Sequence, residues 1–465
     1  MLISNTLGQS SRPFLAFLFA VFVLSPTAPV VGQSDSSKRT VDPRKFGIKL
    51  RPGPVSYEPT RVTTTDQEGR AVVGKTHVKI GDSRIVLLPN GELVTRTKEE
   101  AQVTERPFKR VQSYKYAEKL VKGRFSGFKS KVSRHYIFVY NTSETFAVSA
   151  IRIMDSMFPG VMRYFQRRGM KVDRPEVPLV VLMFRTEREF QNHRRMPSGV
   201  IAYYHTLTNK VVLYEHSNRR RMDFHQTIST MAHEGAHQIL HNIGVQKRLS
   251  VWPMWFAEGM AEYFAPTSAG KSMSWMGPGK VNKHRMMEVA RYVKARGSGS
   301  GDMVKKTVSA ARLTSTGYAS AWSLTHYLAT KKRSSFNKYL RAVSQLRPLE
   351  GGGTVVPPGV IPTNLKLFEE HVGSDLGSIE AKLIAHLKVI ANRKDTIAES
   401  RPHYLVMVVY GKRARRKAKI FATRAKAESW RRRYSRSRGS RSFIRRFPDR
   451  TTAERFSLQW LMPKK

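Results

Sequence analysis

The chain has no cysteine and few acidic residues. Because cysteine is absent from all 465 residues, disulfide bonds and thiolate metal sites are excluded. The 34 Asp and Glu residues stand against 82 Lys and Arg residues, which gives a formal net charge of +48. An excess of this size implies contact with some anionic partner. The lack of thiol chemistry is compatible with a location outside the cytoplasm.

The chain also lacks a long apolar run. The longest candidate, Phe14–Leu24, has eleven residues and is too short to span a bilayer as a helix. Arg12 precedes it and the small residues Val30–Gly32 follow it, a pattern typical of a secretory signal. We therefore expect residues 1–32 to be a signal peptide, with an uncleaved anchor as the alternative. The mature protein should have no transmembrane span and should be secreted, periplasmic or bound to the cell envelope.

Residues 33–110 predict a small β-rich module and a linker. A hairpin is indicated by alternating apolar residues at 77–80, 84–88 and 92–95, with the turn signal Asn90–Gly91 between the last two segments. The following residues are basic and resemble a linker, with one short helix expected at 111–121. This part of the chain carries no recognisable chemistry.

The most informative stretch is a helical pattern that contains His233, Glu234 and His237 in the spacing H-E-x-x-H. Residues four apart lie on one face of a helix, so both imidazoles can reach one metal ion while Glu234 faces a water on that metal. This is the geometry of a zinc hydrolase. A catalytic zinc usually has three protein ligands, so a carboxylate or a third histidine must complete the site. Glu258 and Glu262, on a second short helix, are the nearest carboxylates.

Together, H-E-x-x-H and the later P-x-W-x-x-E-G-x-A-E-Y resemble the gluzincin metallopeptidases, and most closely the peptidase-MA-like domains of secreted bacterial proteins. The resemblance implies that Zn²⁺ is the cofactor, held by His233, His237 and Glu258. It implies that Glu262 fixes a ligand histidine. Glu234 would then act as the general base in peptide hydrolysis.

Residues 133–395 are expected to form this zinc metallopeptidase-like domain, with an α+β fold. Strands are predicted at 136–140, 178–184, 200–204 and 210–214, and helices at 144–168, 281–295, 318–330, 335–346 and 364–390. By the resemblance, a mixed sheet lies over the active-site helix and a helical half lies below. The edge strand beside that helix pairs with an extended peptide, unless it is an ordinary hairpin. Tyr318 would donate to the oxyanion, unless it only packs on the apolar face of its helix.

Residues 401–465 predict a separate β-α-β-like module with an unusual charge. They contain 21 Lys and Arg residues against three acidic residues. Such a surface would bind an anionic polymer, for example nucleic acid, a polysaccharide or a cell-envelope polyanion, by counterion release. Two hypotheses follow for the whole chain. The first is a secreted zinc metallopeptidase that acts on peptide or protein substrates, and the alternative is a non-catalytic surface or scaffold protein that binds anionic polymers.

Overall fold

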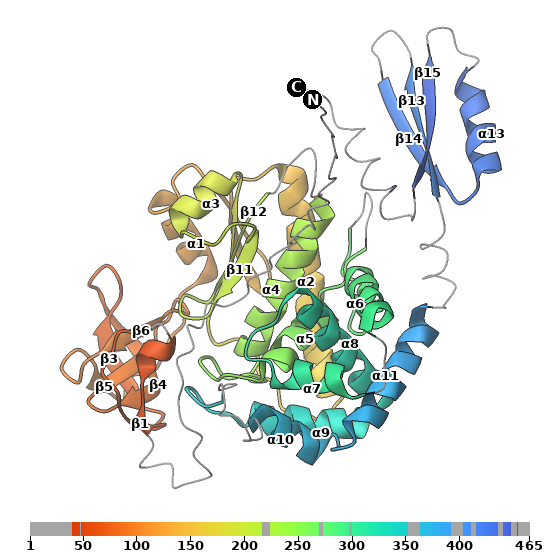
Figure 1. The fold of residues 1–465 in the computed structure, drawn as a ribbon. Helices are drawn as coiled ribbons and strands as arrows, with labels where there is room; N and C mark the ends of the chain where they lie inside the picture. The colour runs from red at the N-terminus through yellow and green to blue at the C-terminus, as the bar shows by residue number, and fades with distance from the viewer. Residues whose placement is uncertain are drawn as a thin grey trace, which may run out of the picture.

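The computed structural model describes residues 40–46, 48–215, 224–268, 273–296, 300–351, 363–391, 403–410, 415–435, 440–447 and 453. Within them the chain forms an N-terminal β-module, a central sheet with helices on both faces, a helical half, and a small C-terminal module (Figure 1). The mixed α+β class expected from the sequence is confirmed. The expected signal peptide, residues 1–32, lies outside the described residues. No helix in the described ranges is long and apolar enough to cross a membrane.

The N-terminal module (residues 40–103) is a seven-stranded antiparallel sheet. Its strands are β1 (Thr40–Val41), β2 (Gly53–Ser56), β3 (Arg61–Thr65), β4 (Ala71–Ile80), β5 (Ser83–Leu87), β6 (Leu93–Arg96) and β7 (Gln102–Val103). The expected turn at Asn90–Gly91 is present, and Gly91 adopts a φ of 93°, which glycine reaches without strain. The hairpin prediction is therefore confirmed.

The central sheet has five strands in the order β11-β12-β10-β9-β8. They are β8 (Lys129–Val132), β9 (Tyr136–Tyr140), β10 (Leu179–Phe184), β11 (Ala202–His205) and β12 (Lys210–Tyr214). The three inner strands are parallel, and β11 and β8 are antiparallel edges. This arrangement leaves one side of β11 without a partner strand among the described residues.

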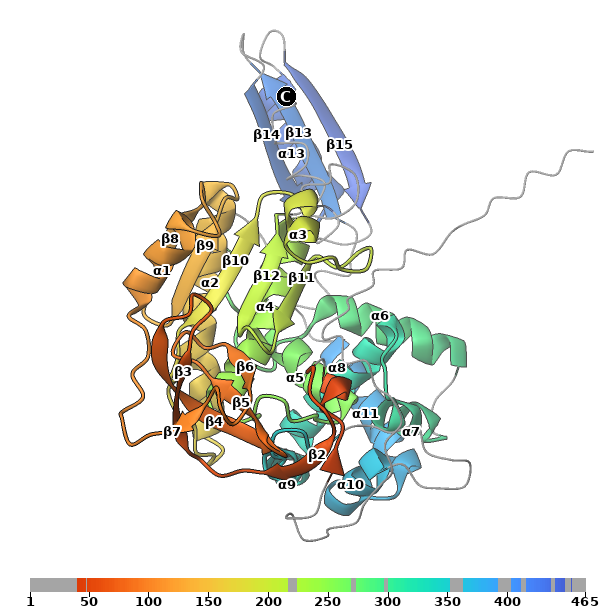
Figure 2. The same cartoon turned by 90° about the vertical axis from the view of Figure 1, so that its left-hand side faces the viewer.

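Helices cover both faces of this sheet, since alternate residues of each inner strand are buried in two different cores. One face packs against α1 (Ser113–Lys122) and α3 (Glu187–His193), and the other against α2 (Glu144–Gln166) and α4 (Phe224–Asn242) (Figure 2). Both α1 and β8 precede residue 133, so the sheet recruits residues upstream of the expected boundary. The sequence did not predict α3, which is only seven residues long.

The helical half follows α4. It consists of α5 (Met254–Phe264), α6 (Lys283–Arg296), α7 (Asp302–Ser309), α8 (Ser315–Lys331), α9 (Arg333–Ser344), α10 (Thr363–His371) and α11 (Leu376–Ala391). The single helix expected at 364–390 is wrong, because Gly373 adopts a φ of 135° and separates two helices. The short α7 was not predicted.

The C-terminal module is a three-stranded antiparallel sheet in the order β14-β13-β15, and helix α13 packs on it. Its elements are β13 (His403–Tyr410), β14 (Arg415–Phe421), α13 (Arg424–Ser435) and β15 (Arg441–Phe447). The β-α-β-like prediction therefore missed β14. Strand β14 consists mostly of basic residues, which do not suggest a buried strand in the sequence. Only Ala418 and Ile420 alternate with the basic residues and pack against one core.

Candidate metal centre

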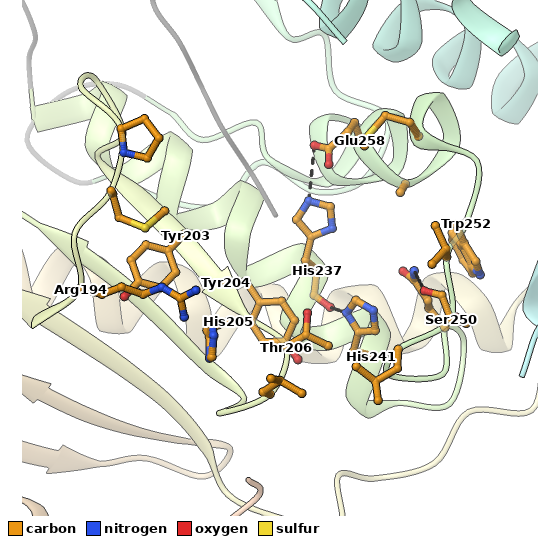
Figure 3. A pocket seen from close by; sticks show the side chains of 18 of the residues that line it. Arg194, Tyr203, Tyr204, His205, Thr206, His237, His241, Ser250, Trp252 and Glu258 are labelled. Atoms are coloured by element: carbon orange, nitrogen blue, oxygen red, sulfur yellow. Dashed lines mark hydrogen bonds and ion pairs between the residues drawn. The ribbon is translucent and has the colours of Figure 1, made fainter. Parts of the chain in front are cut away.

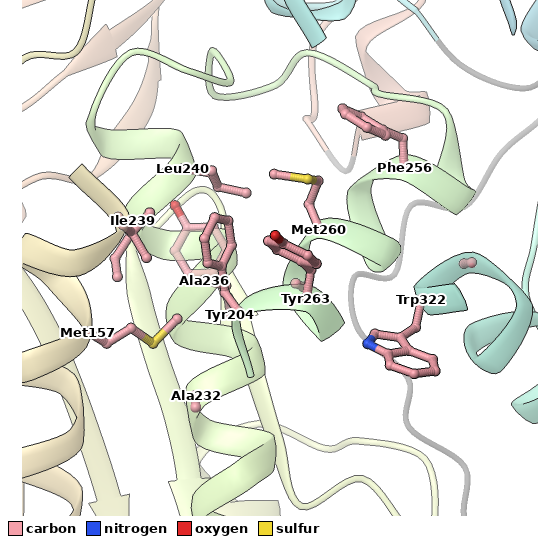
Figure 4. Close-up of a cluster of buried hydrophobic side chains, with 14 of the residues drawn as sticks. Met157, Tyr204, Ala232, Ala236, Ile239, Leu240, Phe256, Met260, Tyr263 and Trp322 are labelled. Atoms are coloured by element: carbon pink, nitrogen blue, oxygen red, sulfur yellow. The ribbon is translucent and has the colours of Figure 1, made fainter. Parts of the chain in front are cut away.

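Helix α4 carries His233, Glu234 and His237 into the centre of the molecule. Its apolar residues pack between the central sheet and α5, and the cluster in Figure 4 includes Ala236, Ile239 and Leu240 from α4 with Met260 from α5. This packing buries all three polar side chains, which are 2%, 0% and 3% exposed, respectively. Buried imidazoles and carboxylates require partners, so their arrangement is informative.

The three expected ligands converge on one point. His233 Nε2 lies 3.1 Å from Glu258 Oε2 and 3.3 Å from His237 Nε2, and His237 Nε2 lies 3.5 Å from the same Glu258 oxygen. Ligands held about 2.1 Å from a tetrahedral zinc ion are about 3.4 Å apart. The residues present therefore fit a zinc ion in both donor type and spacing. Among the described residues, these three form the group able to hold a metal.

Glu258 reaches this point because α5 packs closely on α8. A Cβ atom at Gly259 would lie 2.2 Å from Thr325 Oγ1 and 2.7 Å from the carbonyl oxygen of Ala321, so only glycine permits the contact. Burial raises the pKa of Glu258, but the neighbouring His237 and His233 outweigh burial and lower it to about 2. Glu258 is therefore an anion, as a zinc ligand must be.

Glu262 lies on the far side of His233. Its Oε1 is 3.3 Å from His233 Nδ1 and 2.7 Å from Arg285 Nη2, and its Oε2 accepts a hydrogen bond of 2.7 Å from Asn282. Burial lowers the pKa of His233, but the carboxylates Glu258 and Glu262 outweigh burial and raise it to about 10. With a metal bound at Nε2, the Glu262 carboxylate beside Nδ1 would favour the remaining ring proton there. Burial opposes the charge of Glu262, but Arg285 and His233 lower its pKa below the usual range. The sequence missed Arg285 and Asn282 because they lie among many basic residues with no distinguishing pattern.

The edge strand β11 positions the side chain of Glu234. Its Oε2 accepts a 2.9 Å hydrogen bond from the backbone N–H of Tyr204, whereas its Oε1 has no hydrogen-bond partner among the described residues. Burial raises its pKa, and this effect outweighs the attraction of His233 and His237. A carboxylate with a raised pKa and one uncommitted oxygen is suited to accepting a proton.

Tyr318, on α8, lies beside His233, His237 and Glu258, which together are called the ligand group below. Its ring centre is 6.4 Å from that of His233, and the guanidinium carbon of Arg285 is 5.2 Å from the Tyr318 ring centre. Burial, followed by the nearby carboxylates Glu258 and Glu234, raises the pKa of Tyr318 well above 10. The phenol therefore keeps its proton and can act as a donor. The structure thus brings all six predicted site residues together.

A cavity of about 690 Å³ opens beside the ligand group. His237 and Glu258 reach it, and one wall is formed by the edge strand and the residues after it, from Tyr203 to Leu207 (Figure 3). Trp252, from the segment before α5, also lines the cavity (Figure 3). His241, one turn after His237, also lines the cavity and stacks on the ring of Tyr204, with 5.4 Å between ring centres.

Residues 227–350 match the model of a family described as "Protein of unknown function (DUF1570)". The matched segment runs from within α4 into the loop after α9, so it contains every predicted site residue. No curated protein matches the chain.

Proposed function

We propose that this protein is a zinc-dependent metallopeptidase of the gluzincin type. The observation that carries the proposal is the convergence of two histidine nitrogens and one carboxylate oxygen at 3.1 to 3.5 Å, with Glu234 held next to them. A structural zinc site has four protein ligands, whereas three ligands with an adjacent acid are typical of a catalytic one. The match to an uncharacterised family neither adds to this proposal nor opposes it.

His233, His237 and Glu258 would hold the metal. When bound, Zn²⁺ would act as a Lewis acid that polarises a carbonyl and lowers the pKa of a water molecule. Glu234 then accepts the proton of the attacking water at its uncommitted Oε1 and returns it to the leaving amine. Tyr318 donates its phenol proton as a hydrogen bond to the oxygen that becomes negative.

An extended peptide is the substrate that the edge strand favours. The Tyr204 N–H points away from β12 and donates to Glu234, so the free side of β11 faces Glu234. A substrate strand that paired with this edge would place its backbone next to Glu234 and to the cavity. Such pairing gives affinity through main-chain groups, while the cavity selects side chains.

We further propose that the protein is exported and that its C-terminal module contacts an anionic polymer. Lys417, Lys419, Arg441 and Arg445 are exposed on strands β14 and β15. Closely spaced cations on a small sheet attract polyanions without sequence preference. This surface also favours the alternative function, in which the chain is a non-catalytic scaffold that binds polyanions.

One comparison separates the two functions. Zinc per chain is measured by elemental analysis, and hydrolysis of an unfolded protein substrate is followed for the same sample before and after treatment with a chelator. The metallopeptidase proposal expects about one zinc per chain and cleavage that disappears on chelation. A protein that binds zinc but cleaves no unfolded substrate would support the scaffold.

A further inference from the structure

The N-terminal module packs on the loops that carry the walls of the cavity. Its apolar core includes Leu249, from the loop after α4, and Leu349, from the loop after α9. The backbone N–H of Leu93 donates to the carbonyl of Leu207 over 2.7 Å. Leu207 and Leu249 themselves line the cavity. The module therefore lies directly behind two wall segments.

Arg248 joins these segments. Its side chain is buried, and its guanidinium donates to three main-chain carbonyls: Gly91 in the module at 2.8 Å, Thr206 at 3.0 Å and Leu207 at 3.0 Å. Its own carbonyl accepts a 2.8 Å hydrogen bond from His77 Nε2. A buried guanidinium is costly unless its donors are satisfied, so this side chain fixes the relative positions of all the segments that it contacts.

A buried ion pair fixes the far end of the turn that connects β11 to β12, whose first residues, Thr206 and Leu207, are held by Arg248. Lys210, the first residue of β12, lies 2.7 Å from Glu92 of the module, and the two side chains are 9% and 5% exposed. Between Leu207 and Lys210, Asn209 adopts a φ of 56°, a conformation that needs support from its surroundings. The module thus holds both ends of the turn that connects β11 to β12.

All residues that line the cavity lie between positions 194 and 258, so the module supports the cavity without entering it. We propose that the N-terminal module is a built-in support of the substrate cleft, and that Arg248 is a positioning residue that sets the edge strand β11 for substrate pairing. The role in substrate pairing rests on the proposed peptidase function. Because Arg248 contacts the turn and none of the metal ligands, its loss should weaken substrate binding and leave the zinc group intact.

The test uses the full chain and the variant Arg248→Lys. Arg248 donates from three different nitrogens, and a compact ammonium group cannot reproduce the spread of that planar fork. Zinc content should not change, kcat should stay within about threefold, and KM for an unfolded protein substrate should rise about tenfold. Hydrogen exchange of residues 202–210 should become faster. Arg96→Lys is the matched control: Arg96 donates to Thr64, Thr95 and Thr65 inside the module, so neither KM nor exchange at 202–210 should change.

If Arg248→Lys does not fold, Glu92→Gln supplies the same test from the module side and should raise KM and exchange in the same direction. Unchanged KM and unchanged exchange in the folded variant would overturn the proposal. A rise in kcat/KM would also overturn it, because that result describes an inhibitory module. Exchange is measured without substrate, so a wild type that cleaves nothing refutes the peptidase function, while the exchange result still decides whether Arg248 holds the turn.

Discussion

Replacing Glu234 with glutamine should separate metal binding from proton transfer. Glu234 is fully buried, and its Oε2 accepts the Tyr204 N–H at 2.9 Å. The amide oxygen of glutamine can accept the same hydrogen bond, so the variant keeps the shape of the site. The amide nitrogen takes the place of Oε1, which has no partner among the described residues, and an amide nitrogen cannot accept a proton.

The expected loss of reaction rate follows from the replacement of that single oxygen atom. Removing a general base typically lowers the rate by about 10²–10⁴-fold, which corresponds to about 3–5 kcal/mol in the activation free energy. None of the three proposed zinc ligands changes, so zinc per chain should stay the same. The assay is elemental analysis beside kcat for cleavage of an unfolded protein. A Glu234→Gln variant that cleaves as fast as wild type would remove Glu234 from the mechanism.

Two controls make the comparison specific. His233→Ala should lose zinc and activity together, because two ligands cannot hold a catalytic zinc tightly. Glu380→Gln neutralises another buried carboxylate, one whose Oε2 accepts the N–H of Met303 at 2.8 Å. That variant can lose stability but should keep both zinc and kcat. If it also lost kcat, the effect of Glu234→Gln could not be assigned to proton transfer.

Three further experiments test other parts of the reasoning. Glu258→Ala should lose zinc, whereas Glu262→Ala should weaken zinc affinity by about 10–100-fold; competition with a chelator measures both, and the reverse order would exchange their roles. Burial lowers the pKa of His77 from 6.5 to about 4, so the folded state takes up its proton later than the unfolded state, and stability is lost as the pH falls from 6.5 toward 4. Urea unfolding measures the free energy of unfolding at pH 7 and pH 4.5. Between these two pH values, His77→Gln should lose less of it than wild type, by on the order of 2 kcal/mol. Equal losses would show that His77 is not the group responsible. A chain that ends at residue 391 should elute from a heparin column at much lower salt than the full chain, since most contacts with the polyanion are expected in the C-terminal module. Unchanged elution would mean that another part of the chain binds heparin.

The sequence alone places His233, Glu234 and His237 together because their signal is local. His233 and His237 are one helical turn apart, and the helical period alone puts them on one face. The same period placed Glu234 next to them. Glu258 and Glu262 needed the family resemblance, because a helix-to-helix contact brings them in from 21 residues or more further along the chain. The structure places both beside the histidines.

The sequence failed where a residue's environment comes from distant segments. Strand β14 was missed because an edge strand tolerates basic residues that a buried strand would not. The predicted helix at 364–390 ignored Gly373, whose φ of 135° lies outside the helical region and separates α10 from α11. Arg285 could not be distinguished from the other 81 basic residues until the structure paired it with Glu262.

Helical and strand periodicity, turn chemistry and the H-E-x-x-H spacing were determined by the sequence alone, because each depends on neighbours within a few residues. Tertiary structure decided that the edge strand β11 faces Glu234, that Arg285 pairs with Glu262, and that Arg248 ties the N-terminal module to the cavity wall. Those contacts join residues that lie 23 to 157 positions apart. Only burial makes them specific, since a charge or a carbonyl removed from water must find a partner in whichever segment the fold brings next to it.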